Sequence, residues 1–187
     1  MVLQGIVFGA TQTGVTSLAE RSGHGGAAGL LYAAMGLTSA LAGLGTAALP
    51  RRFTPRTRLR VTTAGMVVLG APLLFAADPV SLLGVLVCFG VTVGPYMITN
   101  FGLAERVVPP SRLSTVMGLL TSGVVVGYAI GSSLGGHLAD TYGPTGAFAV
   151  TLAATVLAFA IAVLAWRTPR HDRGGPAERV PTEAATT

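Results

Sequence analysis

Residues 50–60 read Pro50-Arg51-Arg52-Phe53-Thr54-Pro55-Arg56-Thr57-Arg58-Leu59-Arg60 and lie between two long apolar segments. Five of the chain's twelve Lys and Arg residues are found here, namely Arg51, Arg52, Arg56, Arg58 and Arg60. In membrane proteins, short loops rich in Lys and Arg stay on the cytoplasmic side, because the membrane potential and anionic lipid oppose moving clustered positive charge outward. The stretch therefore predicts a cytoplasmic loop that orients the rest of the chain.

The composition is typical of a membrane protein. Of 187 residues, 51% are hydrophobic and only 10% are charged, whereas soluble domains carry about 25% charged residues. The net charge of +5 does not indicate nucleic-acid binding, because the arginines sit in short loops and a tail and aromatic residues make up only 6%. We therefore expect the lipid bilayer as a partner and no nucleic acid.

Six segments are long and apolar enough to be read as spanning helices, which need about 20 residues with about 17 tolerated. They are residues 2–18, 27–49, 61–77, 80–103, 113–139 and 146–166. The third contains Pro72, which is expected to bend it. Residues 167–187 are rich in Pro, Gly and charge and are predicted to form a disordered cytoplasmic tail.

Counting spans outward from residues 50–60 gives the topology. Eleven of the twelve arginines then lie on the cytoplasmic side, and only Arg21 lies outside. Both termini are thus predicted to be cytoplasmic. All basic residues are Arg, and Ala, Gly and Val are abundant, which favours a GC-rich bacterial source and the bacterial plasma (inner) membrane.

Two short matches suggest an internal repeat. Val7-Phe8-Gly9-Ala10-Thr11 resembles Cys88-Phe89-Gly90-Val91-Thr92, and residues 29–31 and 118–120 both read Gly-Leu-Leu. The first and fourth segments enter the membrane from opposite sides, so a repeat relating them would be inverted. A 3+3 inverted repeat is how each half of several transporters is built.

Small residues form a ladder in the fifth segment, where Gly123, Gly127, Gly131 and Gly135 recur every four residues. This spacing places them on one helix face, where the missing side chains let another backbone approach closely. The ladder predicts a packing face. A second interpretation is a smooth face on which helices slide between two states.

Uncharged polar residues are the best candidates for a substrate cavity, because the central parts of the six segments hold no Asp, Glu, Arg or His. Gln4, Thr11 and Gln12 are expected to share one face of the first segment. The candidates for a cavity are Gln12, Thr92, Tyr96, Asn100, Thr121 and Tyr128. The alternative role for each is an interhelical hydrogen bond.

Chemistry other than transport finds little support. Cys88 is the only cysteine, so no intramolecular disulfide or cysteine-based metal cluster can form. The three histidines show no ligand spacing, and no nucleophile elbow or phosphate-binding loop is present. His137 and Asp140 are expected to have interfacial roles at the outer end of the fifth segment. We expect no enzyme activity, metal or cofactor.

The order of these features resembles a known family. Residues 105–113 read Glu105-Arg106-Val107-Val108-Pro109-Pro110-Ser111-Arg112-Leu113, and the glycine ladder that follows leads to Gly135-Gly136-His137-Leu138-Ala139-Asp140-Thr141-Tyr142-Gly143. Together they resemble the C-terminal half, helices seven to twelve, of a major facilitator superfamily transporter of the bacterial drug or sugar efflux type. The likeness covers about residues 1–166.

The resemblance implies an all-α integral membrane fold that forms one half of a twelve-helix transporter. It implies that the first, second, fourth and fifth helices face a cavity and that the third and sixth face lipid. It also implies secondary active efflux of a small molecule by alternating access. The arginines of residues 50–60 echo the family's gating loop, but Leu49-Pro50-Arg51-Arg52 lacks its acid, which puts the gating contact in doubt.

Three hypotheses for the functional unit remain open. The chain could work with an N-terminal six-helix half, or two copies could form a homodimer of halves, which parallel cytoplasmic termini permit. Alternatively, the chain is a non-transporting remnant or accessory six-helix protein that binds a partner through the glycine ladder.

Overall fold

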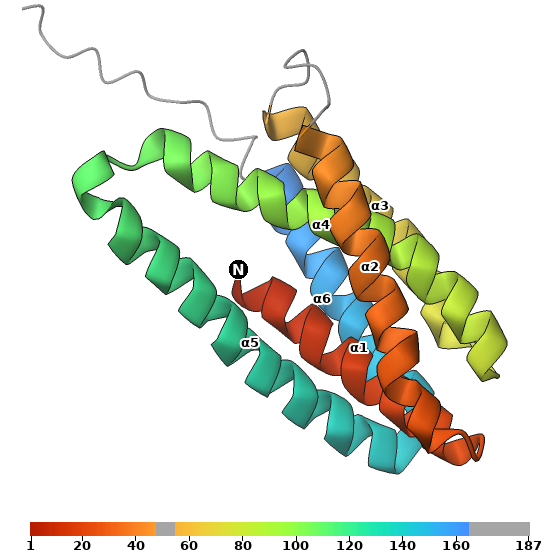
Figure 1. The fold of residues 1–187 in the computed structure, drawn as a ribbon. Helices are drawn as coiled ribbons and strands as arrows, with labels where there is room; N and C mark the ends of the chain where they lie inside the picture. Colours follow the sequence, from red (N-terminus) through yellow and green to blue (C-terminus); the bar gives the residue numbers. More distant parts are fainter. Residues whose placement is uncertain (48–54, 165–187) are drawn as a thin grey trace, which may run out of the picture.

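The computed structural model describes residues 1–47 and 55–164, so Arg51, Arg52 and the expected tail at 167–187 lie outside the described residues. The described part contains six α-helices and no strand (Figure 1). The helices are α1 (Val2–Arg21), α2 (Ala28–Ala47), α3 (Pro55–Gly70), α4 (Pro79–Val107), α5 (Leu113–Tyr142) and α6 (Pro144–Leu164). The all-helical architecture expected from the sequence is confirmed.

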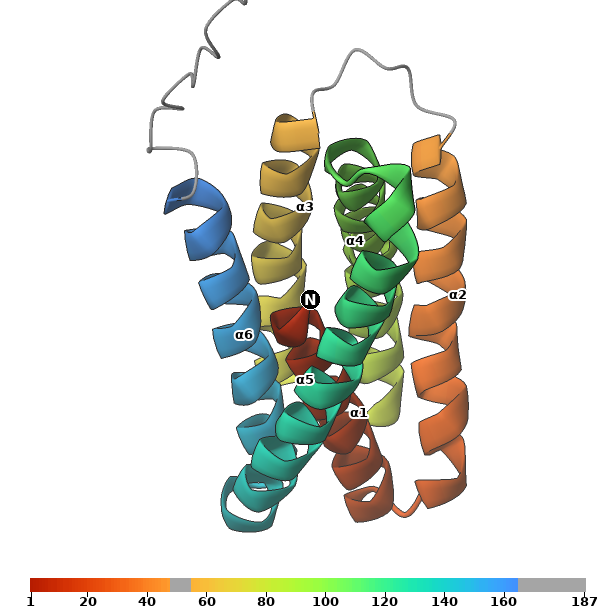
Figure 2. The same cartoon turned by 90° about the vertical axis from the view of Figure 1, so that its left-hand side faces the viewer.

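Helix α1 lies at the centre of the bundle. It packs along α5 and α6, while α2 packs along α4, and α3 contacts both α4 and α6. Figure 2 shows α5 in front of α1, with α2 on one side and α3 and α6 on the other. One side of the molecule is thus formed by α3 and α6, and α2 lies on the opposite side.

Within residues 1–47 and 55–164, five helical segments are long and apolar enough to cross a membrane. They correspond to α2 through α6, and α1 is not among them although a span was expected there. Its sequence includes Gln4, Gln12 and several Thr residues, which lower its hydropathy. Helices α5 and α6 pack along α1, where Gln4 and Thr11 are buried and Gln12 stays exposed.

Helix α3 begins earlier and ends earlier than expected. Pro55 occupies its first position, where a proline's missing N–H costs no hydrogen bond. Arg56, Arg58 and Arg60 therefore belong to the first turns of α3 rather than to a loop. The Arg58 guanidinium donates a hydrogen bond of 2.9 Å to the carbonyl of Thr46, near the end of α2.

Pro72 explains the end of α3. A proline removes one helical N–H and its ring clashes with the carbonyl four residues earlier. The α-helix accordingly stops at Gly70, and the chain continues as a tighter 3-10 helix over Ala71–Phe75. The sequence-based range of 61–77 with a simple bend was wrong on this point.

Asp78 caps the N-terminus of α4. Its carboxylate accepts hydrogen bonds from the backbone amides of Val80 at 3.0 Å and Ser81 at 2.9 Å. The Ser81 hydroxyl in turn accepts from the Asp78 amide, which completes a capping box. The hydrogen bonds from Ser81 contribute most, and together with the bond from Val80 they hold the pKa of the Asp78 carboxyl below its ordinary value of 3.8.

Asp78→Ala should therefore destabilise the protein in a pH-dependent way. A carboxylate whose pKa is lowered by folding contributes stability above its unfolded pKa, and this contribution is lost as pH falls through the folded pKa. We expect a lower melting temperature than wild type at neutral pH, with the gap narrowing below about pH 4. Circular dichroism in detergent measures it, with Glu105→Ala near the other end of α4 as control. A gap independent of pH would contradict the assignment.

The contact between α5 and α1 depends on glycine. A methyl group on Gly127 would overlap the backbone of Val2, and one on Gly131 would overlap the backbone of Ile6. A Cβ at Gly123 or Gly135 would lie within 4 Å of α1 without overlapping it. The ladder thus lies along α1, and at its two middle steps the backbones touch.

Glycines of α1 also contribute to its contact with α5, and glycines of α4 form a similar contact with α2. A Cβ on Gly5 or Gly9 of α1 would overlap the backbone of α5. Similarly, Gly90 and Gly94 of α4 lie directly against the backbone of α2. Close approach of this kind gains dispersion contact, which drives helix association in membranes.

Gly131→Leu should lower the melting temperature of the purified protein or prevent its folding. The new side chain would have to displace Ile6, and overpacking of this kind costs about 1–3 kcal/mol. Gly118→Leu on the same helix is the matched control, because a Cβ there meets nothing within 4 Å. Equal melting temperatures for the two variants would rule out the glycine contact as a determinant of stability.

Candidate functional site

A polar groove of about 370 Å³ runs between α1 and α5. Five of its lining residues come from each helix. They are Gln12, Thr13, Thr16, Ser17 and Glu20 of α1, and Tyr128, Ser132, Gly136, Ala139 and Asp140 of α5.

Gln12 and Tyr128 join the two walls of the groove. The Tyr128 hydroxyl donates a hydrogen bond of 2.5 Å to Oε1 of Gln12. Both side chains remain accessible, and Tyr128 is 39% exposed. The structure therefore brings together two of the candidates that the sequence singled out, and it leaves the Gln12 amide nitrogen available to a further acceptor.

Two carboxylates lie at the end of the groove where α1 and α5 finish. Sequence reasoning gave Asp140 an interfacial role and did not include Glu20 among the candidates for a cavity. The spacing of Gln12, Thr16 and Glu20 by four residues could have shown that all three share one face. The nearby Arg21 donates a hydrogen bond of 3.3 Å to the Ala139 carbonyl, at the end of α5 where a cation is favourable.

The candidates on α4 lie elsewhere. The Thr92 side chain faces Gly65 of α3, and its hydroxyl donates to the Phe89 carbonyl at 2.8 Å. Tyr96 is only 7% exposed, and the Asn100 amide donates to the Tyr96 carbonyl at 2.9 Å. None of the three lines the groove between α1 and α5, so their cavity role stays a prediction.

Thr121 and Ser132 share α5 with Tyr128. Thr121 is exposed two turns before Tyr128, and its hydroxyl donates to the Met117 carbonyl at 3.0 Å. It does not line the groove, whereas Ser132 does. Thr121 is thus placed to extend a polar track along α5 beyond the groove.

The expected single polar face of α1 divides into two. Thr11 is fully buried, and its hydroxyl oxygen lies 3.1 Å from that of Thr151 on α6 in a hydrogen bond. Gln12, one residue later and so turned by about 100°, faces the groove instead. Gln4 is also buried, and its amide nitrogen has no hydrogen-bond partner among the described residues. The expectation that Gln4, Thr11 and Gln12 share one face was wrong.

The Thr11–Thr151 bond should be measurable by a double-mutant cycle of Thr11→Val and Thr151→Val. We expect a coupling energy of about 0.6 kcal/mol in unfolding from detergent, the average for interhelical hydrogen bonds in membrane proteins. The control cycle pairs Thr11 with Thr155, which is buried on α6 but bonded to the Leu152 carbonyl of its own helix. Equal coupling in both cycles would argue against the bond.

Comparison with known proteins adds one finding. No curated protein matches the chain. The family model described as Major Facilitator Superfamily matches residues 1–186, nearly the whole sequence. Members of this family are membrane transporters rather than enzymes, in agreement with the apolar helices of α2 through α6. The chain is a multi-pass membrane protein that belongs to the Major Facilitator Superfamily.

Proposed function

We propose that the chain moves a small molecule out of the cell as the C-terminal half of a secondary active transporter. In this proposal the groove between α1 and α5 is part of the path that the substrate follows. The observation that carries it is the Gln12–Tyr128 hydrogen bond, which holds two accessible polar side chains in a polar groove of an apolar bundle. Binding sites combine apolar walls with a few placed polar groups of this kind.

A second half would cover surfaces that this chain leaves exposed. Helix α5 contacts α1 through its glycine face, while large apolar side chains on its other faces are exposed. The exposed side chains on α2 and α5 include Leu37, Leu41, Leu44, Leu119, Val125, Val126 and Ile130. An N-terminal six-helix half or a second copy of the chain could enclose the groove against these faces. Alternating access then amounts to rocking one half against the other.

The packing of helices supports the 3+3 inverted repeat. Exchanging the first three helices with the last three turns the α1–α5 pair into the α4–α2 pair, and both are close pairs with glycines at the contact. The same exchange turns the α1–α6 contact into the α4–α3 contact. Such an arrangement is expected of inverted repeats.

The accessory-protein hypothesis loses the surface on which it relied. It placed a partner protein on Gly127 and Gly131 of the ladder, but α1 of the same chain already occupies that face. A partner could reach the ladder only by displacing α1. Transport is therefore the function that we retain.

The orientation belongs to the same proposal. Arg58 and Arg60 lie in the first turns of α3. By the positive-inside rule, the end of the bundle where α3 begins faces the cytoplasm of a bacterial cell. Glu20 and Asp140 then lie at the external end of the groove, where outgoing substrate would leave.

Tyr128→Phe and Gln12→Leu should each reduce transport without reducing membrane insertion. Each removes one polar group from the groove, and losing a hydrogen bond to substrate lowers the rate by a factor of about 2–10. The measurement is efflux of a panel of fluorescent cationic, anionic and neutral compounds. The coding region is expressed in cells that lack other exporters. Tyr142→Phe is the matched control, because Tyr142 is 75% exposed at the far end of α5 and lies outside the groove.

Two outcomes would count against the proposal. Unchanged efflux in both groove variants would remove the groove from the substrate path. Equal losses in Tyr128→Phe and Tyr142→Phe would show a general effect on the helix. Asn100→Ala and Tyr96→Ala in the same assay decide whether the α4 residues contribute, since neither lines the groove.

A further inference from the structure

The groove between α1 and α5 is lined by two rows of residues at a spacing of four, which places each row on one helix face. The rows are Gln12, Thr16 and Glu20 on α1, and Tyr128, Ser132, Gly136 and Asp140 on α5. The two helices run in the same direction, because Gly127 lies against the start of α1 and Gly135 lies against Ala10. Each row therefore begins at the Gln12–Tyr128 hydrogen bond and ends at a carboxylate.

The charge of this lining is negative. Glu20 and Asp140 are both exposed, and Lys, Arg and His are absent from the lining. Neither carboxylate forms an ion pair with another residue in the ranges 1–47 and 55–164. Arg21 lies outside the lining and donates its hydrogen bond to the Ala139 carbonyl. The groove thus presents two carboxylates to a molecule that enters it.

Acidic residues are few in the described part of the chain. Residues 1–47 and 55–164 contain four of them, namely Glu20, Asp78, Glu105 and Asp140. Asp78 caps α4, and Glu105 lies near the other end of that helix. The remaining two are the two that line the groove. A chain whose net charge is +5 therefore has an anionic surface in its polar groove.

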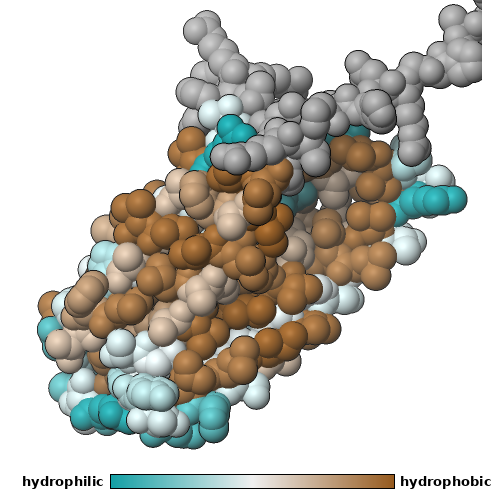
Figure 3. All heavy atoms as spheres, turned by 180° about the vertical axis from the view of Figure 1, so that it is seen from behind, coloured by the Kyte–Doolittle hydropathy of each residue, from teal (hydrophilic) through white to brown (hydrophobic). Residues whose placement is uncertain are grey.

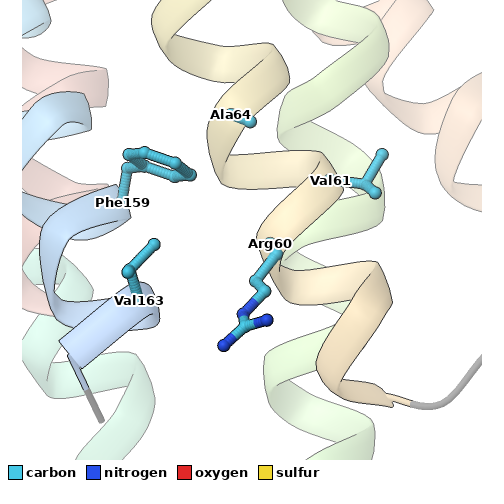
Figure 4. Close-up of a pocket in the computed structure, with 5 residues that line it drawn as sticks. All are labelled: Arg60, Val61, Ala64, Phe159 and Val163. Atoms are coloured by element: carbon cyan, nitrogen blue, oxygen red, sulfur yellow. The ribbon is translucent and has the colours of Figure 1, made fainter. Parts of the chain in front are cut away.

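The opposite side of the bundle has a different character. A cavity of about 460 Å³ between α3 and α6 is lined by Arg60 and by the apolar residues Val61, Ala64, Phe159 and Val163 (Figure 4). Figure 3 shows the face behind Figure 1 as mostly hydrophobic, with hydrophilic residues gathered toward its ends. Of these two cavities, the groove between α1 and α5 is the one lined by carboxylates.

We propose that the groove takes an elongated organic cation as its substrate. The cationic group lies near Glu20 and Asp140, and a polar or aromatic part lies at Gln12 and Tyr128. At a rise of about 1.5 Å per residue, Glu20 lies about 12 Å along α1 from Gln12, which sets the length of the substrate. The exposed Tyr128 ring suits stacking on an aromatic group. This inference rests on the proposed function, in which the groove is part of the substrate path.

Closure of the groove favours a cation over other substrates. When a second half covers the groove, the two carboxylates lose water, and a buried charge is costly unless an opposite charge compensates it. An organic cation supplies that charge, whereas a neutral molecule leaves the carboxylates uncompensated and an anion adds repulsion. A bare metal ion fits less well, because the described residues hold no group of three or more His, Cys, Asp or Glu residues that could ligate one.

Equilibrium dialysis of the purified full chain in detergent tests the substrate class. The probes are three fluorescent compounds with the same aromatic core and alkyl linker, which end in a trimethylammonium, an uncharged tert-butyl or a carboxylate group. We expect the wild type to bind the trimethylammonium probe about tenfold more tightly than the tert-butyl probe, since each exposed ion pair contributes a factor of up to about 5. The carboxylate probe should bind least. A trimethylammonium probe with a linker too short to span about 12 Å should bind more weakly, because it cannot reach both ends of the groove.

Variants separate the two ends of the groove. Glu20→Gln and Asp140→Asn should each weaken binding of the trimethylammonium probe about threefold and leave the tert-butyl probe unchanged. Glu105→Gln is the matched control, because it removes the same charge from a residue that does not line the groove, and it should bind like wild type. Tyr128→Leu should weaken all three probes alike, since they share the aromatic core.

Three binding results would overturn the substrate class. They are equal binding of the trimethylammonium and tert-butyl probes by the wild type, equal losses in Glu20→Gln and Glu105→Gln, which would mean attraction to net charge alone, and displacement of the probe by an equal concentration of Mg²⁺, which would mean a metal-ion site.

The same probes in the efflux assay distinguish this inference from the proposed function. Binding of the trimethylammonium probe without its efflux would support the substrate class and contradict transport. Efflux of the tert-butyl or carboxylate probe in preference to the trimethylammonium probe, reduced by Tyr128→Phe, would support transport through the groove and overturn the substrate class.

Discussion

The close backbone contact between α1 and α5 is the interaction on which the bundle depends. Helix α1 carries glutamines and threonines, and among the six described helices it alone is not a candidate membrane span, yet it lies at the centre. It can do so because glycines on both helices bring the backbones together, with Gly127 against Val2 and Gly131 against Ile6. A side chain larger than hydrogen at either step would separate the helices and open the polar interior of the bundle.

This central position gives α1 two kinds of polar contact. Toward α6 it is closed, and Thr11 shares a buried hydrogen bond with Thr151. In the groove between α1 and α5, Gln12 accepts a hydrogen bond from Tyr128 and remains accessible. The same helix therefore supplies a packing bond and a wall of the polar groove, because one step along the helix turns the side chain by about 100°.

The outer surface divides in a way that suits a membrane transporter. The face of α3 and α6 is apolar over its middle, with Arg60 near one end. Helices α2 and α5 expose apolar side chains as well, and α5 also forms one wall of the polar groove. Charge is thus kept to the ends of the bundle, where water and lipid headgroups can solvate it.

Much of the fold follows from the sequence alone, since apolar segments of spanning length and arginine-rich connections do not depend on tertiary context. Helix ends were less predictable. Helix α3 ends at Gly70, just before Pro72, and it begins at Pro55, so that three arginines of the expected loop belong to its first turns. The partners of polar side chains could not be read from spacing, because helical periodicity groups residues by face without saying which helix covers that face. Gln12 and Tyr128 meet only because glycine lets α5 lie against α1, whereas Tyr96 is buried by its neighbours. The sequence by itself determined a polytopic helical protein and its polar residues; the tertiary structure decided which of them are accessible, since accessibility is a property of helix pairs.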